Sequence, residues 1–307
     1  MAGVVAMNAQ VPAFPGAQGF GRFATGGRGG SVYYVTTTND SGPGSFRDAV
    51  SQPNRTVVFA VSGVIDYKPP RYNVKNNITI AGQTAPGDGV VLYGDGIGYT
   101  DADNTITRFI RFRMGKNGTG EDTVTVARGS NMIFDHISAT WSLDEVFSVS
   151  GSPDPSGITI QSSIIGQGLE EHSAGGLIQT AGGVSIVGSL YIDNGTRNPK
   201  VKGVNEFVNN VVYNWKTDAY ILGDSAGDSY ANVIGNYFIN GPNSGSSGAF
   251  SRGNLNFHLF AADNWQDKNR NGVLDGVLLM QSDYDVNDWQ ASPYPYPVAP
   301  EAALPAL

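Results

Sequence analysis

Five short apolar segments in the middle of the chain decide its fold. They are IFDHISATW (133–141), ITIQSSIIG (158–166), IVGSLYIDN (186–194), FVNNVVYNW (207–215) and VIGNYFING (233–241). Each segment is bounded by Gly, Asn, Asp or Ser, a pattern typical of short buried β-strands. No long stretch has a helical period, so we expect helix only as a minor component, around Ser45 to Ser51.

A polar or small residue recurs at one position of these segments. The series is His136, Ser163, Ser189, Asn210 and Asn236, with separations of 27, 26, 21 and 26 residues by subtraction. A period of about 20–30 residues is typical of a solenoid. The separations suit a parallel β-helix in which each coil holds three short strands and three turns, and in which the recurring residues form an internal ladder of hydrogen bonds. We therefore predict an all-β parallel β-helix and interpret His136 as a ladder residue rather than a catalytic base.

Two other architectures fit less well. Leucine-rich repeats share the period, but their leucine spacing and the helical half of each repeat are missing. A β-sandwich would show hairpin signals, of which the sequence has few. We expect a single domain over residues 1–307. In it, the N-terminal segment to about Ser51, including PGAQGFGRFATGGRGG (15–30), would cap the solenoid, and the Pro/Ala-rich tail 293–307 would be a linker or a cut-off continuation.

Composition restricts the function. The chain of 307 residues is 40% hydrophobic and 15% charged, so it can bury one large core. It has no apolar run of about eighteen residues for a membrane span, and no cysteine for a disulfide, a thiol nucleophile or a metal site. The formal net charge of -8 argues against nucleic acid and against an anionic membrane surface as partners. A polyanionic substrate would need a basic cluster or a bound divalent metal at its cleft.

Charged residues recur at one offset from the ladder. Asp144, Glu171 and Arg197 each follow a ladder residue by eight positions, so equal turns would stack them at one corner of successive coils. Coils about 4.8 Å apart would then leave about 10 Å between Asp144 and Arg197, room for a metal ion and one sugar residue. One coil earlier lies Asp122. The basic residues nearby are Arg197, Lys200 and Lys202. Carboxylates that hold a cation beside a basic cluster suit a polyuronate cleft, and the alternative for RNPKVK is a solvated turn.

Longer motifs run in a fixed order through most of the chain. They are PGAQGFGRFATGGRGG, PGSFRDAV, DTVTV, IFDHISATWSLDE, ITIQSSIIG, EHSAGGLI, RNPKVKG and VNNVVYNW. Their order and wording resemble the pectate lyases of polysaccharide lyase family one, in its divergent fungal and bacterial branch. The resemblance implies a right-handed parallel β-helix that uses Ca²⁺ to cleave pectate or a related polyuronate by β-elimination. It also implies that Asp122 and Asp144 are calcium ligands, and that Arg197, first in R-x-P-x-x-[RK], is the catalytic base. Lys202 falls where the family has an arginine that binds a substrate carboxylate.

Two positions depart from the family pattern. The third calcium carboxylate, four residues after Asp144, is Ser148, and the substrate-binding lysine expected after His172 is Ser173. Neighbouring side chains can compensate, and we therefore extend the candidate set. The cleft calcium ligands are Asp122, Asp144 and Glu145, and the substrate-binding candidates are Lys200, Lys202, His172 and Glu171.

The implied reaction explains these residue types. β-Elimination removes the C5 proton next to a carboxylate and expels the glycosidic oxygen at C4. Calcium can bind the substrate carboxylate together with protein carboxylates and take up the developing charge. An arginine base must lose its proton, which nearby cations and alkaline pH favour, and the alternative is an arginine that stays charged and stabilises the enolate.

Two other functions stay open on the sequence. A β-helix glycoside hydrolase would use paired carboxylates, but it would leave the arginine unexplained. A non-catalytic carbohydrate-binding β-helix would account for Ser148 and Ser173.

The expected setting is extracellular. We predict a secreted monomer that acts on an acidic plant-type polysaccharide and binds neither nucleic acid nor membrane. Sequons that could carry glycans in a eukaryotic secretory pathway begin at Asn39, Asn54, Asn77, Asn117 and Asn194. The opening MAGVVAMNAQ (1–10) is too short for a complete signal peptide and is interpreted as a trimmed remnant.

A second calcium site is predicted in the late loop DKNRNGVLDG (267–276). The predicted ligands are Asp267, Asn269, Asn271, the Val273 carbonyl and Asp275. Their spacing matches the opening of an EF-hand-type loop, with Gly272 at the sharp turn, although position twelve is Leu278 instead of Glu. The alternative is a polar turn that needs no metal.

Overall fold

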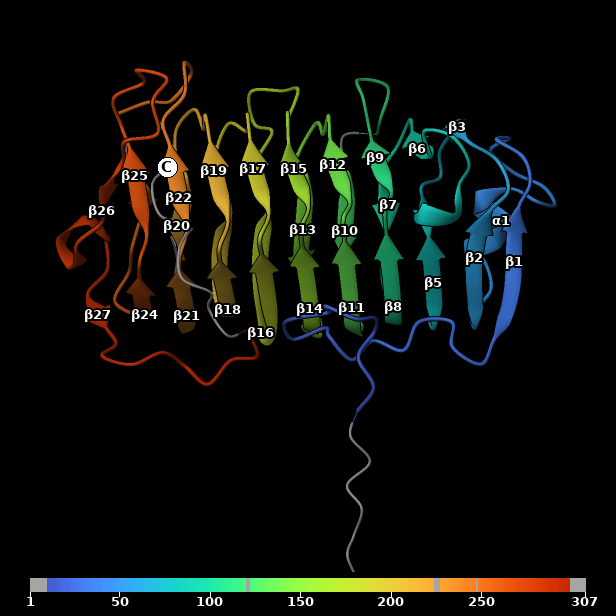
Figure 1. Cartoon of the computed structure of the whole chain (residues 1–307), viewed down its shortest axis with the longest axis horizontal. Helices are drawn as coiled ribbons and strands as arrows, with labels where there is room; N and C mark the ends of the chain where they lie inside the picture. Colours follow the sequence, from blue (N-terminus) through green and yellow to red (C-terminus); the bar gives the residue numbers. More distant parts are fainter. Residues whose placement is uncertain (1–9, 120–121, 224–226, 247, 299–307) are drawn as a thin grey trace, which may run out of the picture.

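The structure, a computed structural model, describes residues 10–119, 122–223, 227–246 and 248–298, and these residues build one elongated parallel β-helix (Figure 1). The predicted remnant at the start of the chain, apart from Gln10, lies outside the described residues. Apart from the antiparallel last strand, β26, strands from successive coils pair in parallel and form three faces, which we call face 1, face 2 and face 3. Faces 1 and 2 join into one sheet because β16 and β18 run through both.

The strands follow in order along each face. Face 1 contains β4 (Tyr72–Asn73), β7 (Ile97–Gly98), β10 (Val124–Val126), β13 (Phe147–Ser150), the first parts of β16 (Leu177–Val187) and β18 (Lys200–Val208), β20 (Tyr220–Leu222) and β23 (Phe250–Ser251). Face 2 contains β1 (Ser31–Val35), β2 (Arg55–Phe59), β5 (Ile78–Ala81), β8 (Asp103–Arg108), β11 (Ser130–Asp135), β14 (Ser156–Gln161), the second parts of β16 and β18, β21 (Ser229–Ile234), β24 (Phe257–Ala262) and β27 (Asp288–Trp289). Face 3 contains β3 (Gly63–Asp66), β6 (Val90–Tyr93), β9 (Arg111–Arg113), β12 (Ser138–Thr140), β15 (Ile164–Gly166), β17 (Leu190–Ile192), β19 (Val211–Tyr213), β22 (Tyr237–Ile239), β25 (Trp265–Asp267) and β26 (Val277–Leu278). The short helices are α1 (Phe46–Val50), η1 (Gly82–Thr84) and η2 (Gln281–Asp283).

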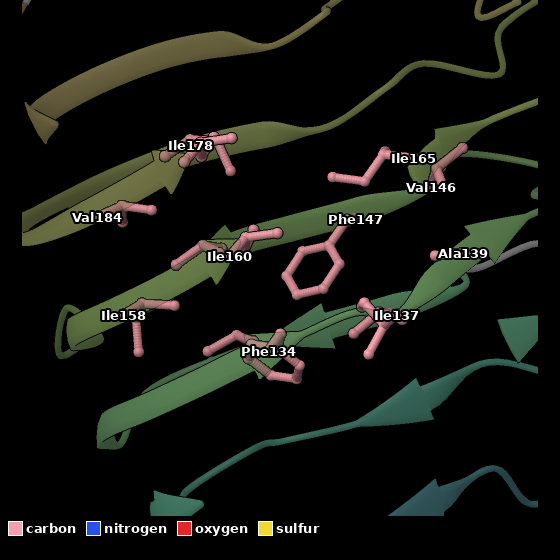
Figure 2. Packing of buried hydrophobic residues seen from close by; sticks show 14 of the residues in the cluster. Phe134, Ile137, Ala139, Val146, Phe147, Ile158, Ile160, Ile165, Ile178 and Val184 are labelled. Atoms are coloured by element: carbon pink, nitrogen blue, oxygen red, sulfur yellow. The ribbon is translucent and has the colours of Figure 1, made fainter. Parts of the chain in front are cut away.

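Inward side chains from the three faces fill the solenoid. One row on face 2 pairs in register from coil to coil and is at most 2% exposed; it consists of Phe134, Ile160, Ile186, Phe207 and Val233. Figure 2 shows Phe134 and Ile160 pointing into the same interior as Phe147 of face 1, whose ring packs edge-on against Phe134 at 5.0 Å. Alternate strand residues point inward, so each short strand adds apolar area to a continuous core. The predicted all-β parallel β-helix is confirmed.

The predicted ladder runs along the interior corner between faces 2 and 3. The backbone N–H of Ser163 donates to Ser189 Oγ (3.1 Å), Ser189 N–H to Asn210 Oδ1 (2.9 Å), and Asn210 N–H to Asn236 Oδ1 (2.8 Å). One further rung follows, because Asn236 N–H donates to Asn264 Oδ1 (3.0 Å). Each ladder side chain thus satisfies a backbone donor that the turn would otherwise leave buried and unpaired.

The ladder prediction is wrong for His136. Register aligns Ser138 with Ile164, so Ile137, not His136, stands level with Ser163, and Ile137 N–H donates to Ser163 Oγ (3.2 Å). His136 sits one residue earlier with a φ of 52°, half-exposed and stacked on the Phe109 ring at 4.7 Å. Its imidazole therefore faces solvent at the corner between faces 2 and 3.

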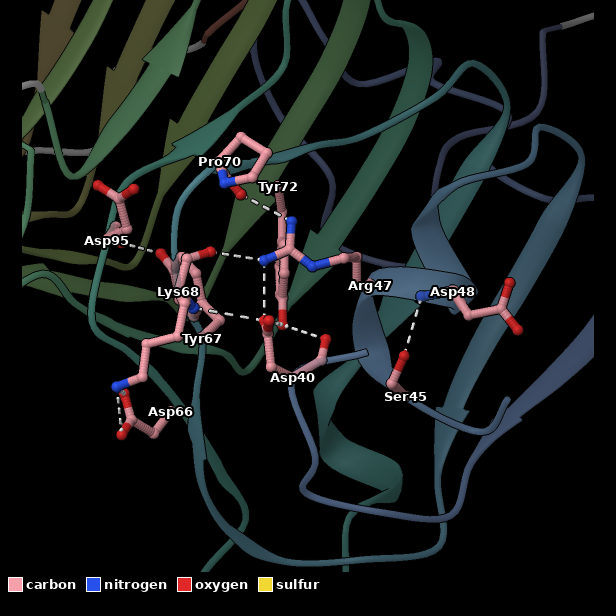
Figure 3. A network of polar contacts seen from close by, with 10 residues as sticks. All are labelled: Asp40, Ser45, Arg47, Asp48, Asp66, Tyr67, Lys68, Pro70, Tyr72 and Asp95. Carbon is pink, nitrogen blue, oxygen red and sulfur yellow. Dashed lines mark hydrogen bonds and ion pairs between the residues drawn. The ribbon is translucent and has the colours of Figure 1, made fainter. Parts of the chain in front are cut away.

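Helix α1 covers one end of the core. Phe46, Ala49 and Val50 are buried in the core, and Ser45 caps the helix by accepting a hydrogen bond from Asp48 N–H (3.2 Å). Figure 3 shows how the segment is tied down: Arg47 donates to Asp40 Oδ1 at 2.8 Å. The expected helix near Ser45 is therefore present, and it covers the end of the solenoid.

The opposite end is closed by the segment after β26. Leu279 and Tyr284 are buried, and the Tyr284 ring packs against Phe250 at 4.5 Å and against Trp289 at 5.3 Å. Both ends of the apolar column are thus shielded from water.

The glycine-rich stretch 15–30 was predicted to cap the solenoid. In the structure it crosses the outer surface of face 2 instead. Phe20 N–H donates to Ser185 Oγ (2.9 Å) and Gly21 N–H to Thr159 Oγ1 (2.8 Å), which lie on β16 and β14. A Cβ at Gly21 would stand 2.0 Å from the Met132 carbonyl oxygen, so only glycine allows this close approach. Gly21 thus serves close contact between backbones rather than a free turn.

The C-terminal segment 293–298 also lies on face 2 and is not a free linker over these residues. Tyr294 N–H donates to Asn232 Oδ1 (2.9 Å), and Val298 N–H donates to Glu206 Oε2 (3.2 Å). The Tyr296 ring packs against Phe20 at 5.3 Å, so the two terminal segments meet. The remainder of the predicted tail, 299–307, lies outside the described residues.

One of the predicted glycosylation sites, Asn194, is buried. Asn194 is 2% exposed, and its amide donates to the Ile165 carbonyl (3.2 Å) and to Asn198 Oδ1 (2.9 Å), so it cannot carry a glycan in the folded chain. Within the part of the chain that the structure describes, no helix has the length and apolar character to cross a membrane.

Candidate active site

Three carboxylates lie together in the turns that lead into face 1, just before β10 and β13. Val124 of β10 pairs with Phe147 of β13, and the same offset places Asp122 level with Glu145 on the next coil. Glu145 N–H donates to Asp122 Oδ1 (3.1 Å). Carboxylate oxygens of Asp122, Asp144 and Glu145 all lie within 4.8 Å of one another. The structure thus brings together the three residues predicted as cleft calcium ligands.

Burial and the closeness of the three carboxyl groups raise the pKa of two of them. Burial, and then the neighbouring Asp144 carboxylate, raise the pKa of Asp122 above its ordinary value. Burial, and then the neighbouring Glu145 carboxyl group, raise the pKa of Asp144. Asp144 Oδ1 is buried and accepts no hydrogen bond from the described residues. Crowded carboxylates of this kind are stabilised by a shared proton or by a bound metal ion.

Arg197 stands beside this cluster. Bridges from Glu145 to Ala174 and from Ala174 to Thr196 bring the Arg197 turn level with the carboxylates, two coils further on. Arg197 Nη1 donates to Glu145 Oε1, and the two side chains are 24% and 9% exposed. A Cβ at Gly175 would stand 2.5 Å from the Arg197 carbonyl oxygen, so this glycine lets the turn approach its neighbour. An arginine and three carboxylates therefore share one small region of the surface.

The predicted stack of Asp144, Glu171 and Arg197 at equal offsets is wrong. The residues level with one another are Glu145, Ala174 and Thr196. The turn before Ala174 is longer than its neighbours, so Glu171 lies within a loop instead. There the Glu171 carboxylate is 3.4 Å from Lys216 Nζ and 93% exposed. Its role in substrate binding remains a prediction, and it does not join the carboxylate cluster.

The other substrate-binding candidates lie nearer the cluster. His172 Nε2 is 3.7 Å from Asp144 Oδ1. Lys200 and Lys202 flank the buried Val201 on β18, so both point outward from face 1, with Lys200 level with Leu177 of β16 and Ile221 of β20. A row of basic residues thus leads away from the carboxylates along the same face.

The structure explains both departures from the family pattern. Ser148 is 3% exposed, and its Oγ accepts a hydrogen bond from Leu177 N–H (3.3 Å). Ser173 is fully buried, accepts from Glu170 N–H (2.8 Å) and donates to the Ser142 carbonyl (2.9 Å), so it supports the loop and cannot reach a substrate. Glu145 supplies the third carboxylate that Ser148 lacks.

Sequence reasoning missed a charged pair, Asp218 and Arg252, on the coils that follow Arg197. Asp218 is 10% exposed at its side chain, and its Oδ2 accepts from Arg252 Nη2 (2.8 Å). Asp218 follows Arg197 by 21 residues, the same separation as that between Ser189 and Asn210. That repeat spacing was the signal that could have found it.

The late loop forms a compact polar turn. The side-chain amides of Asn269 and Asn271 donate to the two oxygens of Asp275 (2.7 and 3.0 Å), and these bonds lower the pKa of that carboxyl. Gly272 has a φ of 78°. The Val273 carbonyl accepts from Asp275 N–H (3.0 Å), and Asp267 Oδ1 accepts from Asn269 N–H (3.3 Å). The predicted ligands are therefore gathered, with the amide groups turned to satisfy the loop internally.

Solved structures share this architecture. The major cedar pollen allergen Jun a 1 aligns with a TM-score of 0.66 at 18% identity, over 91% of this chain and 85% of the allergen. The pectate lyase pelN from Paenibacillus sp. 0602 aligns with a TM-score of 0.61 at 13% identity, over 93% of this chain and 91% of the enzyme. These neighbours place the fold in the class of right-handed parallel β-helices to which pectate lyases belong.

Curated relatives define the family. The probable pectate lyase C of Aspergillus fumigatus is 57% identical over 298 residues, covering 96% of this chain and 70% of the relative. The probable pectate lyase C of Aspergillus terreus is 60% identical over 269 residues, covering 87% of this chain and 63% of the relative. No protein-family model matches the chain. The chain belongs to the pectate lyase family and is a polysaccharide lyase, so the hydrolase and the non-catalytic binding module are set aside.

Proposed function

We propose that this protein is a secreted lyase that cleaves polygalacturonate or a related polyuronate by calcium-assisted β-elimination. The observation that carries the proposal is the grouping of Asp122, Asp144 and Glu145 beside Arg197 on face 1. Carboxylates alone would repel an anionic polymer. A cation held by them, with basic residues alongside, reverses the sign of the surface that the substrate meets.

The three carboxylates fit calcium. Ca²⁺ takes six to eight oxygen ligands at about 2.3–2.6 Å, so oxygens of one coordination shell lie within about 5 Å of one another. The cluster meets this limit, and Asp144 Oδ1, which accepts no hydrogen bond from the described residues, would be available to a cation. Asp122, Asp144 and Glu145 would hold the ion, and the remaining ligands would come from substrate and water. Bound there, calcium supplies positive charge against the negative charge that develops on the substrate carboxylate.

The basic residues would orient the polymer. Lys200 and Lys202 point outward from β18 and would pair with uronate carboxylates of neighbouring sugars. Arg197 stands between these lysines and the carboxylate cluster, where the C5 proton of the bound sugar would meet it. Arg197 in its neutral form would take that proton as the C5–H electron pair forms the C4=C5 bond. The C4–O bond would break with its electrons going to the leaving oxygen, which would take a proton from water. His172, beside Asp144, would contact the same sugar from the loop after β15.

Related proteins support a polyuronate as the substrate. A pectate lyase from Bacillus sp. N165, whose fold resembles this one with a TM-score of 0.52, was solved in complex with trigalacturonate. The relatives of this chain from Aspergillus species are named probable pectate lyase C. We extend the proposal to an extracellular monomer, consistent with a substrate too large to enter a cell.

A second, structural calcium site is proposed in the late loop. Asp267, Asn269, Asn271, the Val273 carbonyl and Asp275 would hold it after the two amide side chains rotate their oxygens inward. The loop packs near Tyr237, whose hydroxyl accepts from Gly276 N–H (2.8 Å), so an ion there would fix the loop against face 3.

Product analysis tests the proposed reaction. Polygalacturonate is incubated with the protein, and ultraviolet absorbance of the unsaturated product is followed in parallel with reducing ends. Elimination gives one unsaturated end for each new reducing end. Reducing ends without absorbance would mean hydrolysis and would refute the proposal.

A further inference from the structure

Arg197 is flanked by carboxylates on both sides. Lys200 pairs with Ile221, and the same offset places Asp218 level with Arg197 on the following coil. The bond from Asn198 N–H to the Ala219 carbonyl (2.8 Å) agrees with this register. On the other side, the Arg197 guanidinium contacts Glu145. The Arg197 turn therefore lies between the coil that carries Glu145 and the coil that carries Asp218.

Asp218 is engaged by the residues around it. Its Oδ1 accepts from Ser251 Oγ (2.9 Å), and its Oδ2 accepts from Arg252 Nη2 (2.8 Å) and from Thr196 Oγ1 (3.3 Å). Its backbone carbonyl accepts from Asn198 Nδ2 (3.2 Å). Thr196 and Asn198 are the two neighbours of Arg197 in the chain. One residue thus holds both sides of the turn that carries the arginine.

We propose that Asp218, with Arg252 as its counter-ion, is a positioning residue for Arg197. Asp218 fixes the turn through Thr196 and Asn198, and Arg252 neutralises the carboxylate so that it does not capture the neighbouring guanidinium. A nearly buried carboxylate that loses its counter-ion is strongly destabilised, so pairing with another cation becomes favourable. Without Arg252, that cation is Arg197, which would turn away from the carboxylate cluster and from the substrate.

Another arginine–aspartate pair lies on an earlier coil. Arg128 comes two residues after β10 and has a φ of 62°, close to the 59° of Arg252, which directly follows β23. Arg128 Nε and Nη2 donate to the two oxygens of Asp101 (2.5 and 2.6 Å). Asp101 is 64% exposed at its side chain, so loss of this pair leaves a solvated carboxylate. Arg128→Gln is therefore the control for loss of an arginine that pairs with an exposed carboxylate.

The proposal rests on the proposed role of Arg197, and a double-mutant cycle separates the two. Steady-state kinetics on polygalacturonate in saturating calcium compares Arg252→Gln, Asp218→Asn, Asp218→Ala and the Arg252→Gln/Asp218→Asn double variant. We expect Arg252→Gln to lower kcat about tenfold or more while KM stays within about threefold, because positioning acts on the chemical step. Adding Asp218→Asn removes the competing charge and should restore most of kcat. Asp218→Ala, which removes the tether, should lower kcat with little change in KM.

Thermal midpoints above the assay temperature for every variant exclude unfolding as the cause of a lower kcat. A double variant as slow as Arg252→Gln alone, or a wild-type kcat in Arg252→Gln, would overturn the proposal. If Arg197→Lys itself kept wild-type turnover, the proposed function would fail first. Arg128→Gln should match the parent in kcat, and a loss there as large as in Arg252→Gln would remove the specificity claimed for Asp218.

Discussion

Replacement of Asn236 by alanine tests the ladder that sets the coil register. The Asn236 side chain accepts from Asn210 N–H (2.8 Å) and donates to the Phe207 carbonyl (2.8 Å) and to Asn264 Oδ1 (2.8 Å). Asn210, Asn236 and Phe207 are each 1% exposed, so water cannot replace the lost partner. A buried polar group that loses its partner costs about 1–3 kcal/mol, and two backbone groups are affected, so we expect a loss of about 3 kcal/mol in the free energy of unfolding.

The assay is thermal unfolding followed by circular dichroism. For a chain of this size each kcal/mol lowers Tm by about 2–4 °C, so Asn236→Ala should melt about 10 °C below the parent. The exposed Asn39 provides the control, and Asn39→Ala should leave Tm within about 1 °C. A Tm for Asn236→Ala equal to that of the control would refute the claim that the ladder satisfies buried backbone groups.

Three further predictions concern the arginine, the late loop and the terminal segments. Arg197→Lys should lose most turnover at an unchanged Tm, because lysine keeps the charge but not the planar guanidinium; wild-type turnover would show that another residue meets the C5 proton. Asp267→Ala combined with Asp275→Ala should reduce the rise in Tm that calcium gives the parent to the part that comes from the cleft site, with kcat nearly intact; equal stabilisation of parent and variant by calcium would mean that the loop binds none. Burial raises the pKa of Glu206, so the folded state binds this proton more tightly than the unfolded state. The stability that this proton gives is present below the unfolded pKa of about 4.3 and is lost as pH rises through the higher folded pKa, so Glu206→Gln should flatten the fall of Tm between weakly acidic and neutral pH; an unchanged fall would count against this residue.

The fold could be predicted from the sequence because every coil has a buried turn with the same hydrogen-bonding requirement. A buried turn needs a side chain that accepts from the backbone, and Ser163, Ser189, Asn210 and Asn236 mark that position in the sequence. The prediction for His136 was wrong because His136 lies one position before the ladder. At that position the side chain faces solvent and is not needed to accept a hydrogen bond from a buried backbone group.

The grouping of Asp122, Asp144 and Glu145 beside Arg197 agrees with the prediction from sequence, but its geometry was not predicted. Glu145, Ala174 and Thr196 stand level, yet they follow their ladder positions Ile137, Ser163 and Ser189 by 8, 11 and 7 residues by subtraction. Turn length is free to vary where the turn faces solvent, so no fixed offset could locate the row. The residue types around Arg197 were recognisable, whereas the carboxylate that faces it depended on loop lengths.

The terminal segments were the least predictable parts. Glycine and proline in 15–30 and 293–298 signal irregular structure, but not the surface on which it lies. Their docking depends on single partners from distant coils, such as Ser185 for Phe20 and Glu206 for Val298. Contacts of this kind leave no periodic trace in the sequence.

The most direct test of the proposed chemistry is a calcium titration of unsaturated product formation on polygalacturonate. The protein is first stripped with a chelator, and calcium is then added back to the parent and to Asp144→Asn, with calcium binding measured on both by calorimetry. Elimination that depends on the cluster Asp122, Asp144 and Glu145 predicts no absorbance change after stripping and full recovery in the parent. It also predicts a titration shifted to higher calcium, with matching weaker binding, in Asp144→Asn. Full formation of unsaturated product by the stripped parent would contradict calcium-assisted elimination at this site.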